Sequence, residues 1–216
     1  MQPSTGPRTP TPARRGRPRT FDRDQVLRQA MELFWLNGFQ GSSINELSQA
    51  TGLAAPSLYA AFGSKEALFG EAVALYLARE ADTAWQALDQ APRLADAIRS
   101  LLADTVRLFA RAGSPRGCLL VLGDKGLAPP SASVRQALQA QRDARRQRLS
   151  ARLRRALDDG ELAADTDVDA LAAAVFIFMS GLSIETADGI SEARLLEAID
   201  EFMARWPRPP QARRPA

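Results

Sequence analysis

The sequence contains no histidine and only one cysteine, Cys118, among its 216 residues. Without histidine the chain lacks the commonest general acid and base, and a single cysteine leaves too few soft ligands for a zinc site. One cysteine also excludes an intrachain disulfide, which fits a reducing compartment. A glycine-rich phosphate loop is missing as well. We therefore expect no enzyme, no catalytic residue, no metal and no cofactor.

Long hydrophobic runs are also scarce. The N-terminal residues are charged and have no apolar stretch, so they do not form a secretory signal. The longest uncharged apolar run, residues 170–184, is shorter than the roughly 20 residues that span a bilayer, and it favours a buried helix. We expect a cytoplasmic protein without membrane contact.

Acidic residues are absent from both ends of the chain. Residues 1–20 hold five arginines, and the segment after Trp206 holds three more. Residues 21–206 carry 20 basic and 25 acidic side chains, although the whole chain has a net charge of +3. Because the positive excess is confined to the ends, any contact with a polyanion should be local. Residues 1–20 and 207–216 are predicted to be a disordered basic arm and a disordered basic tail.

Helical periodicity runs through the rest of the chain, and no segment alternates for long enough to predict a strand. A short apolar run, residues 118–122, is compatible with either a helix or an extended segment. The predicted helices span residues 21–37, 43–51, 56–62, 64–87, 94–109, 131–158, 169–187 and 191–205. The sequence therefore predicts an all-α fold.

The segment 43–62 has the pattern of a helix-turn-helix motif. Ser43 and Glu46 have the spacing of a capping box, and Gly52 suits the end of the first helix. In such a motif the second helix lies in the major groove, while helix N-termini hold phosphates. Candidate DNA contacts are Ser43, Ser57, Tyr59 and Lys65. Each also has an ordinary structural interpretation, as an N-cap, a core aromatic or a solvated charge, but together with the arginines upstream they favour DNA.

Residues 44–69, INELSQATGLAAPSLYAAFGSKEALF, resemble the DNA-binding signature of the TetR/AcrR family of bacterial transcriptional regulators. The match covers roughly residues 14–80 and includes the Gly52–Leu53 turn and segments 56–59 and 62–69. More weakly, residues 158–182 resemble part of the family's regulatory domain.

The resemblance implies an all-helical, homodimeric repressor that binds double-stranded DNA at a palindromic operator. A small ligand in the C-terminal domain would change the spacing of the two DNA-binding heads and release the operator. On this basis residues 21–66 form the helix-turn-helix domain, a linking helix runs to about residue 87, and residues 88–206 form a helical regulatory and dimerisation domain. A constitutive or architectural DNA-binding protein without an effector would have the same head.

The second helix of the motif departs from the family pattern. Members of the family often carry Lys, Arg or His there, whereas this sequence has four alanines: Ala54, Ala55, Ala60 and Ala61. An alanine such as Ala55 can contact a thymine methyl group but discriminates little between bases. Base reading must then depend on Ser57, Tyr59, DNA shape and a contact outside this helix.

Residues 14–20, RRGRPRT, supply a candidate for that contact. Arg-Gly-Arg-Pro resembles the core of an AT-hook, in which glycine and proline keep the backbone slim enough for a narrow minor groove. We expect Arg15, Arg17 and Arg19 to reach the minor groove beside each half-site. The alternative is a solvated tail that gives only non-specific attraction.

The C-terminal two-thirds of the chain is expected to hold a ligand pocket for a small apolar or amphipathic effector. Candidate lining residues, chosen from apolar helix faces, are Val106, Phe109, Cys118, Leu122, Phe176 and Met179. Cys118 could sense an electrophile or oxidant, but a lone buried cysteine is usually inert.

Two arginines and two helices complete the expectations for this region. Arg142 and Arg145 could neutralise an acidic ligand, although snorkelling to the surface or pairing with Glu185 or Asp188 is the more ordinary role. The helices at 169–187 and 191–205 are expected at the dimer interface, with plain core packing as the alternative.

Overall fold

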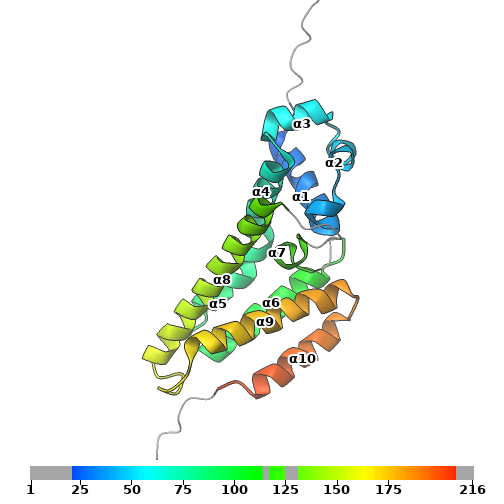
Figure 1. The fold of residues 1–216 in the computed structure, drawn as a ribbon. Coiled ribbons are helices and arrows are strands. Elements are labelled where there is room, and N and C mark those ends of the chain that lie inside the picture. Colours follow the sequence, from blue (N-terminus) through cyan, green and yellow to red (C-terminus); the bar gives the residue numbers. More distant parts are fainter. Residues whose placement is uncertain (1–20, 114–116, 125–130, 208–216) are drawn as a thin grey trace, which may run out of the picture.

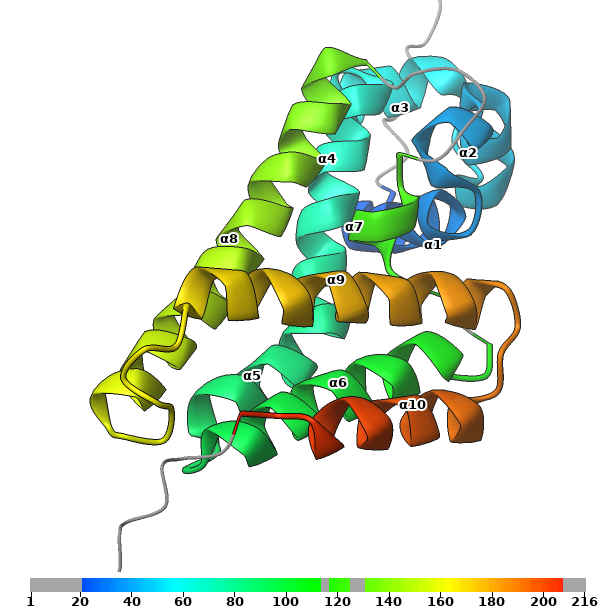
Figure 2. The same cartoon turned by 60° about the horizontal axis from the view of Figure 1, so that its bottom comes forward.

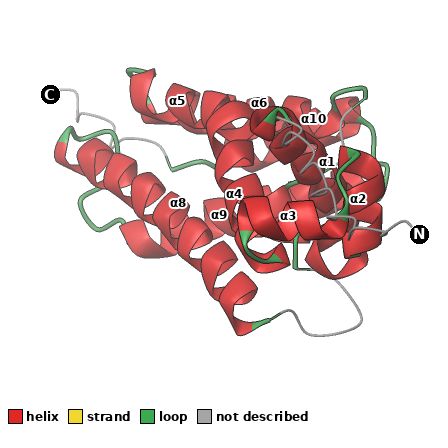
Figure 3. Ribbon diagram, turned by 90° about the horizontal axis from the view of Figure 1, so that it is seen from above, coloured by secondary structure: helices red, strands yellow, loops and turns green. Residues whose placement is uncertain are grey.

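The computed structural model describes residues 21–113, 117–124 and 131–207. Within these residues the chain forms ten α-helices, one π-helical segment and no strand, so the all-α prediction is confirmed (Figure 3). The elements are α1 (Arg23–Gly41), α2 (Ile44–Thr51), α3 (Ala55–Phe62), α4 (Lys65–Tyr76), η1 (Leu77–Ala81, the π-helical segment), α5 (Asp82–Gln90), α6 (Leu94–Ala110), α7 (Leu119–Leu122), α8 (Ala132–Asp158), α9 (Val168–Ala187) and α10 (Glu192–Ala204).

The helices form two groups. Helices α1, α2 and α3 gather at one end of the molecule, which we call the head, and α4 runs from the head along α8 (Figure 1). Helices α5, α6, α9 and α10 pack together at the other end (Figures 1 and 2). Because α4 and α8 reach both groups, they connect the two ends of the molecule.

Local sequence signals set the ends of the head helices. The Asp22 carboxylate caps α1 by accepting from the backbone N–H groups of Asp24 and Gln25. Helix α1 leaves helical geometry at Gly38, where φ is 70° and ψ is 175°, and then resumes as far as Gly41. The predicted stop at residue 38 is therefore a kink. Gly52 ends α2 in the left-handed conformation that glycine adopts without steric cost, as predicted.

An aromatic cluster forms the centre of the head. The Phe69 ring meets the rings of Phe34 and Phe39 edge-on, at centroid distances of 5.0 and 5.3 Å. Leu47 from α2 and Leu58 from α3 are buried against this cluster. Each buried side chain of this size stabilises the fold by about 1.5–3 kcal/mol. These contacts fix the orientation of the two short helices on α1 and α4.

The long helix predicted over residues 64–87 is interrupted. It is α-helical to Tyr76, π-helical over Leu77–Ala81 and α-helical again from Asp82. Tyr76 and Ala81 are five residues apart and both are buried. An i→i+5 turn places such a pair on one face, whereas a regular α-helix would turn them apart. The prediction of one unbroken helix was therefore wrong, because the packing partners of this segment override its helical periodicity.

Helix α9 is not the fully buried helix that its apolar sequence predicted. Val175 and Phe176 face the core, but Ile177 is 72% exposed and Ile184 is also exposed. The helix of 20 residues extends beyond the apolar run of residues 170–184, so by length and composition alone α9 could cross a membrane, a test that the core helix of a soluble protein also passes. Its contacts with α6, α8 and α10 instead place one face of α9 in the core of the second helix group (Figure 2).

Candidate DNA-binding surface and ligand cavity

Over its two turns, helix α3 has one buried face and one exposed face. Leu58 and Phe62 are buried in the head, and the intervening Tyr59 is 45% exposed. Ser57 is exposed and Ala55 is half-buried. The core-aromatic alternative for Tyr59 is therefore wrong. The candidate base-reading side chains lie on the face of α3 that the protein leaves open.

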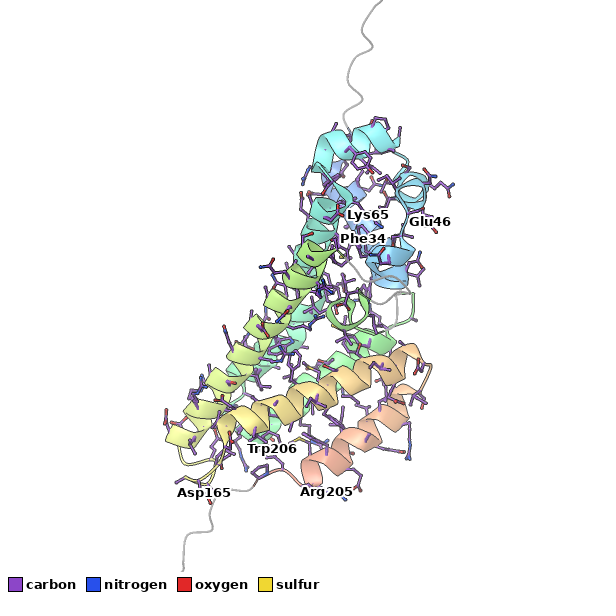
Figure 4. The ribbon with its side chains drawn as sticks, viewed as in Figure 1. Phe34, Glu46, Lys65, Asp165, Arg205 and Trp206 are labelled. Atoms are coloured by element: carbon purple, nitrogen blue, oxygen red, sulfur yellow. The ribbon has the colours of Figure 1, made fainter. Side chains whose placement is uncertain are left out.

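The capping box at the start of α2 is present. The Ser43 hydroxyl accepts from the Glu46 N–H at 3.1 Å, and the Glu46 carboxylate accepts from the Ser43 N–H at 2.7 Å. The Ser43 backbone N–H and, to a smaller extent, the Ser43 hydroxyl lower the pKa of Glu46, because both donate to the carboxylate and stabilise its charged form. Figure 4 shows Glu46 on the outer side of α2.

Lys65 is the first residue of α4, and its ammonium lies over an aromatic ring. The Nζ atom is 4.2 Å from the centroid of the Phe39 ring, which attracts a cation through its negative face. Partial burial of the group lowers the pKa of Lys65. Figure 4 shows Lys65 close to Phe34 at the start of this helix. The ring holds a positive charge at a helix N-terminus, where the helix dipole alone would disfavour it.

The described part of the head has little positive charge. Arg23 is engaged in the fold, because it donates to Glu71 at 2.8 Å and lies 4.5 Å over the Phe62 ring. Residues 21–66 hold three basic side chains (Arg23, Arg28 and Lys65) and five acidic ones (Asp22, Asp24, Glu32, Glu46 and Glu66). Arg15, Arg17 and Arg19 lie outside the described residues. The positive charge needed near DNA phosphates is therefore concentrated in the sequence before α1.

A small cavity lies where the two helix groups meet. Its volume is about 40 Å³. The walls come from α4, η1, α5, α6, α7, α8 and α9. The lining residues are Tyr76, Leu77, Ala81, Ala84, Trp85, Thr105, Leu108, Phe109, Cys118, Leu120, Val121, Arg142, Arg145, Phe176, Met179 and Ser180. A cavity of this size holds no more than a few water molecules, so a larger ligand would have to displace side chains.

Four of the six pocket candidates line this cavity: Phe109, Cys118, Phe176 and Met179. Val106 is fully buried in the core between α6 and its neighbours. Leu122 is half-buried at the end of α7 and is not among the lining residues either. The apolar face of a helix does not distinguish core from cavity, which is why these two were misplaced.

The polar residues of the cavity were mostly missed. Tyr76, at the end of α4, donates its hydroxyl to the Cys118 sulfur at 3.5 Å. Burial raises the pKa of both groups, so the thiol stays protonated at neutral pH. Tyr76 and Trp85 have an aromatic body with a polar atom at one edge, and this was the only signal in the sequence that could have marked them as cavity residues.

The two arginines of α8 pair differently from the sequence-based expectation. Arg142 donates to the Leu120 carbonyl at 2.6 Å and lies 3.7 Å from Asp124. Arg145 pairs with Asp82 at 3.1 Å. Pairing with Glu185 or Asp188 was therefore wrong. Figure 2 shows the reason, because α8 crosses α9 near the beginning of α9, and these two acids lie at its other end.

Helix α7 joins the head to the cavity. The Trp35 indole N–H donates to the Gly117 carbonyl at 2.7 Å, and the Phe39 N–H donates to the Gly123 carbonyl at 2.8 Å. Between these two anchors lie Cys118, Leu120 and Val121, which line the cavity. A displacement of α7 by a bound molecule would therefore act directly on α1.

Comparison with known proteins gives matches over both helix groups. Residues 26–72 match the family model of bacterial regulatory proteins of the tetR family, and residues 95–206 match the tetracyclin repressor-like C-terminal domain. The HTH-type transcriptional repressor ComR of Escherichia coli is 31% identical over 194 residues, which cover 89% of this chain and 92% of ComR. The transcriptional regulator AcuR of Cereibacter sphaeroides is 33% identical over 187 residues, covering 82% and 84% of the two chains.

A solved structure agrees with these matches. A cysteine mutant of the TetR family transcriptional regulator CifR, in complex with a 26 bp double-stranded operator DNA, is 42% identical and superposes with a TM-score of 0.84. The match covers 89% of this chain and 100% of that chain. The chain therefore belongs to the TetR family of bacterial transcriptional regulators.

Proposed function

We propose that this protein is a homodimeric, cytoplasmic repressor that leaves a palindromic operator when a small apolar or amphipathic ligand enters the cavity. The observation that carries this proposal is the double anchor of α7, whose ends hydrogen-bond to α1 while its middle lines the cavity. Residues 21–66 act as the DNA-binding domain, with a linking segment to about residue 87, and residues 88–206 sense the ligand and dimerise.

Release follows from the small size of the cavity. Sites for small organic molecules commonly have volumes of about 300–1,000 Å³, so a ligand must push apart the walls of this cavity. Two of the elements that form those walls contact the head. Helix α4 packs against α1, and the glycines that flank α7 accept hydrogen bonds from α1. Densely packed cores shift between discrete arrangements and do not deform smoothly. Ligand entry then repositions the head, and the spacing of two heads in a dimer no longer fits the operator.

On the DNA, the exposed face of α3 enters the major groove. Ser57 and Tyr59 contact base edges, Ala55 packs against thymine methyl groups, and Ser43 and Lys65 contact phosphates. The excess of acidic over basic side chains in residues 21–66 supports a role for the arm, because this domain brings little positive charge of its own. The arm contributes Arg15, Arg17 and Arg19 in the adjacent minor groove.

The exposed apolar face of α9 supports dimerisation. Ile177, the most exposed of the large hydrophobic residues described, lies on α9, and Ile184 is exposed two turns later. Phe178 and Phe202 stack at 4.3 Å beside a surface hollow between α9 and α10. Contiguous apolar surface on a soluble chain usually marks an interaction site. A second copy related by two-fold symmetry would cover the same face on both chains.

Footprinting of the DNA upstream of the protein's own gene tests the proposal. We expect one protected palindrome whose half-sites are separated by about one helical turn or a multiple of it. Protection should recede when a cavity-binding compound is added. Uniform protection without a discrete site, unaffected by any compound, would favour the architectural alternative, in which the cavity has no regulatory role.

A further inference from the structure

Among the residues that the structure describes, those lining the cavity include two guanidinium groups and no carboxylate. The partners of Arg142 are the Leu120 carbonyl and Asp124. Arg145 differs, because its side chain is only 10% exposed and its Nη1 atom is buried without a hydrogen-bond partner among the described residues. A buried N–H of a charged group without an acceptor is costly, so this atom marks a position that is suited to an acceptor.

The carboxylate that Arg145 does contact is only a partial counter-ion. Asp82 Oδ1 lies 3.1 Å from Arg145 and also 3.5 Å from Arg148. The Asp82 side chain is about half exposed, so water screens its charge. Arg148 has a second carboxylate, Asp89, at 2.5 Å. The carboxylate that pairs with the buried guanidinium of Arg145 is therefore both shared with Arg148 and screened by water.

Within the described parts of the chain, two hydroxyl groups in the same wall donate to sulfur atoms. Tyr76 donates to the Cys118 thiol at 3.5 Å, and Thr105 donates to the Met179 thioether at 4.0 Å. Sulfur is a weak acceptor, so both hydroxyls would gain from an oxygen acceptor. Together with Arg145 they form three donors around one cavity. The remaining wall is mainly apolar and aromatic and includes Trp85, whose ring lies 4.7 Å from the Arg145 guanidinium.

We propose that the effector of this protein is a small amphipathic organic anion, above all a carboxylate, whose oxygens accept from Arg145 and whose apolar body lies among the aromatic residues of the cavity. This inference rests on the proposed function and specifies its ligand class. An anion at Arg145 competes with Asp82 for the same guanidinium. Asp82 begins α5 directly after the π-helical segment, so the loss of this pair acts on the joint below α4.

Calorimetric titration of the full-length protein with matched probes tests the ligand class. The probes are benzoate and hexanoate, each compared with its neutral amide of nearly the same shape. A charge-assisted hydrogen bond to a buried guanidinium corresponds to a preference of about 10- to 100-fold, so each carboxylate should bind the wild type at least tenfold more tightly than its amide.

Two arginine variants locate the preference. Arg145→Met should abolish it, because the guanidinium donor is removed while an unbranched side chain is kept at this position. Arg148→Met is the matched control, since Arg148 also pairs with Asp82 and lies 5.8 Å from the Trp85 ring but does not line the cavity. This variant should retain the preference. Circular dichroism melting curves show whether each variant is folded, and the wild-type comparison needs no variant at all.

Each failure has its own signature. Equal binding of acid and amide by the wild type, no binding of either carboxylate, or a preference that survives in folded Arg145→Met overturns the inference. Operator binding is measured separately in the same samples. If a carboxylate fills the cavity with the expected preference while the operator stays bound, the ligand class holds and the proposed release mechanism fails.

Discussion

Tyr59 is the only large side chain of α3 that is exposed, at 45% of its surface. We expect Tyr59→Ala to weaken operator binding about tenfold, because loss of a hydrogen bond or apolar contact at a base edge costs on the order of 1 kcal/mol, and about 1.4 kcal/mol corresponds to tenfold. The free energy of unfolding of this variant, measured in urea, should stay within about 0.5 kcal/mol of the wild-type value, as for other exposed substitutions. Fluorescence anisotropy with labelled operator measures the affinity.

Tyr59→Phe separates the two parts of this side chain. If the hydroxyl reads a base, Tyr59→Phe should behave like Tyr59→Ala, and if the ring packs on the DNA, it should behave like the wild type. Wild-type affinity in both variants would remove Tyr59 from the DNA interface.

Cys118 offers a test by pH. Burial raises the pKa of its thiol, and only the thiolate reacts with iodoacetamide. Native protein should therefore be alkylated more slowly than urea-unfolded protein at the same neutral pH, and its rate should begin to rise only at a higher pH. Because the folded protein binds the thiol proton more tightly than the unfolded chain does, this proton stabilises the fold below the ordinary pKa of the thiol. That contribution to the free energy of unfolding is lost as pH rises through the raised pKa. Mass spectrometry follows the reaction, and equal native and unfolded rates would contradict a buried, inert thiol.

At the scale of elements, the segment from Gly117 to Gly123 is the physical link between cavity and head. Gly117 has a φ of 82°, and a Cβ atom there would lie 2.7 Å from the Ser183 carbonyl oxygen and 2.5 Å from Leu122. We expect Gly117→Ala to lower the free energy of unfolding by about 2–4 kcal/mol, from backbone strain together with overpacking. Operator affinity should fall as well, because the Gly117 carbonyl accepts from the Trp35 indole N–H that anchors this segment to α1.

Gly113→Ala is the matched control for this substitution. Gly113 has a similar φ of 79° but open space around its Cβ position. Gly113→Ala should therefore lower the free energy of unfolding by only about 1 kcal/mol, through backbone strain, and should leave operator affinity unchanged. Urea denaturation measures both values, and equal effects of the two substitutions would show that the contacts of Gly117 carry no special role.

The arm before α1 is the second element with a specific prediction. Removing residues 1–19 should weaken operator binding at least tenfold and reduce the slope of log affinity against log salt, by about one unit for each phosphate charge no longer neutralised. A full-length variant with Gln at Arg15, Arg17 and Arg19 should reproduce both effects. Unchanged affinity and slope in these two proteins would contradict a role for the arm.

The sequence predicted the head better than the cavity, and the reason is physical. The capping box of Ser43 and Glu46 and the helix end at Gly52 are signals within one or two helical turns, where local energetics decide the structure. The cavity combines residues from seven elements, among them Tyr76, which precedes a π-helical turn that periodicity does not show. The pairing of the α8 arginines depended on where α8 crosses α9, which is a property of the packed molecule.

In the whole molecule, we propose that filling the cavity changes the affinity of the head for DNA. Two chains acting as a symmetric dimer would bind one operator, and ligand would shift the equilibrium by a coupling free energy, typically about 1–3 kcal/mol, or 5- to 150-fold in operator affinity. The hydrogen bonds of α7 to α1, together with α4, are the only route from cavity to head that this account requires.

The most direct test is a release titration at known cavity occupancy. The wild-type protein is bound to its labelled operator, and benzoate or hexanoate is added up to the concentration at which calorimetry shows the cavity to be full. We expect the anisotropy to fall towards that of free DNA over the same concentration range in which the cavity fills. An operator that remains fully bound at saturation would contradict this proposal.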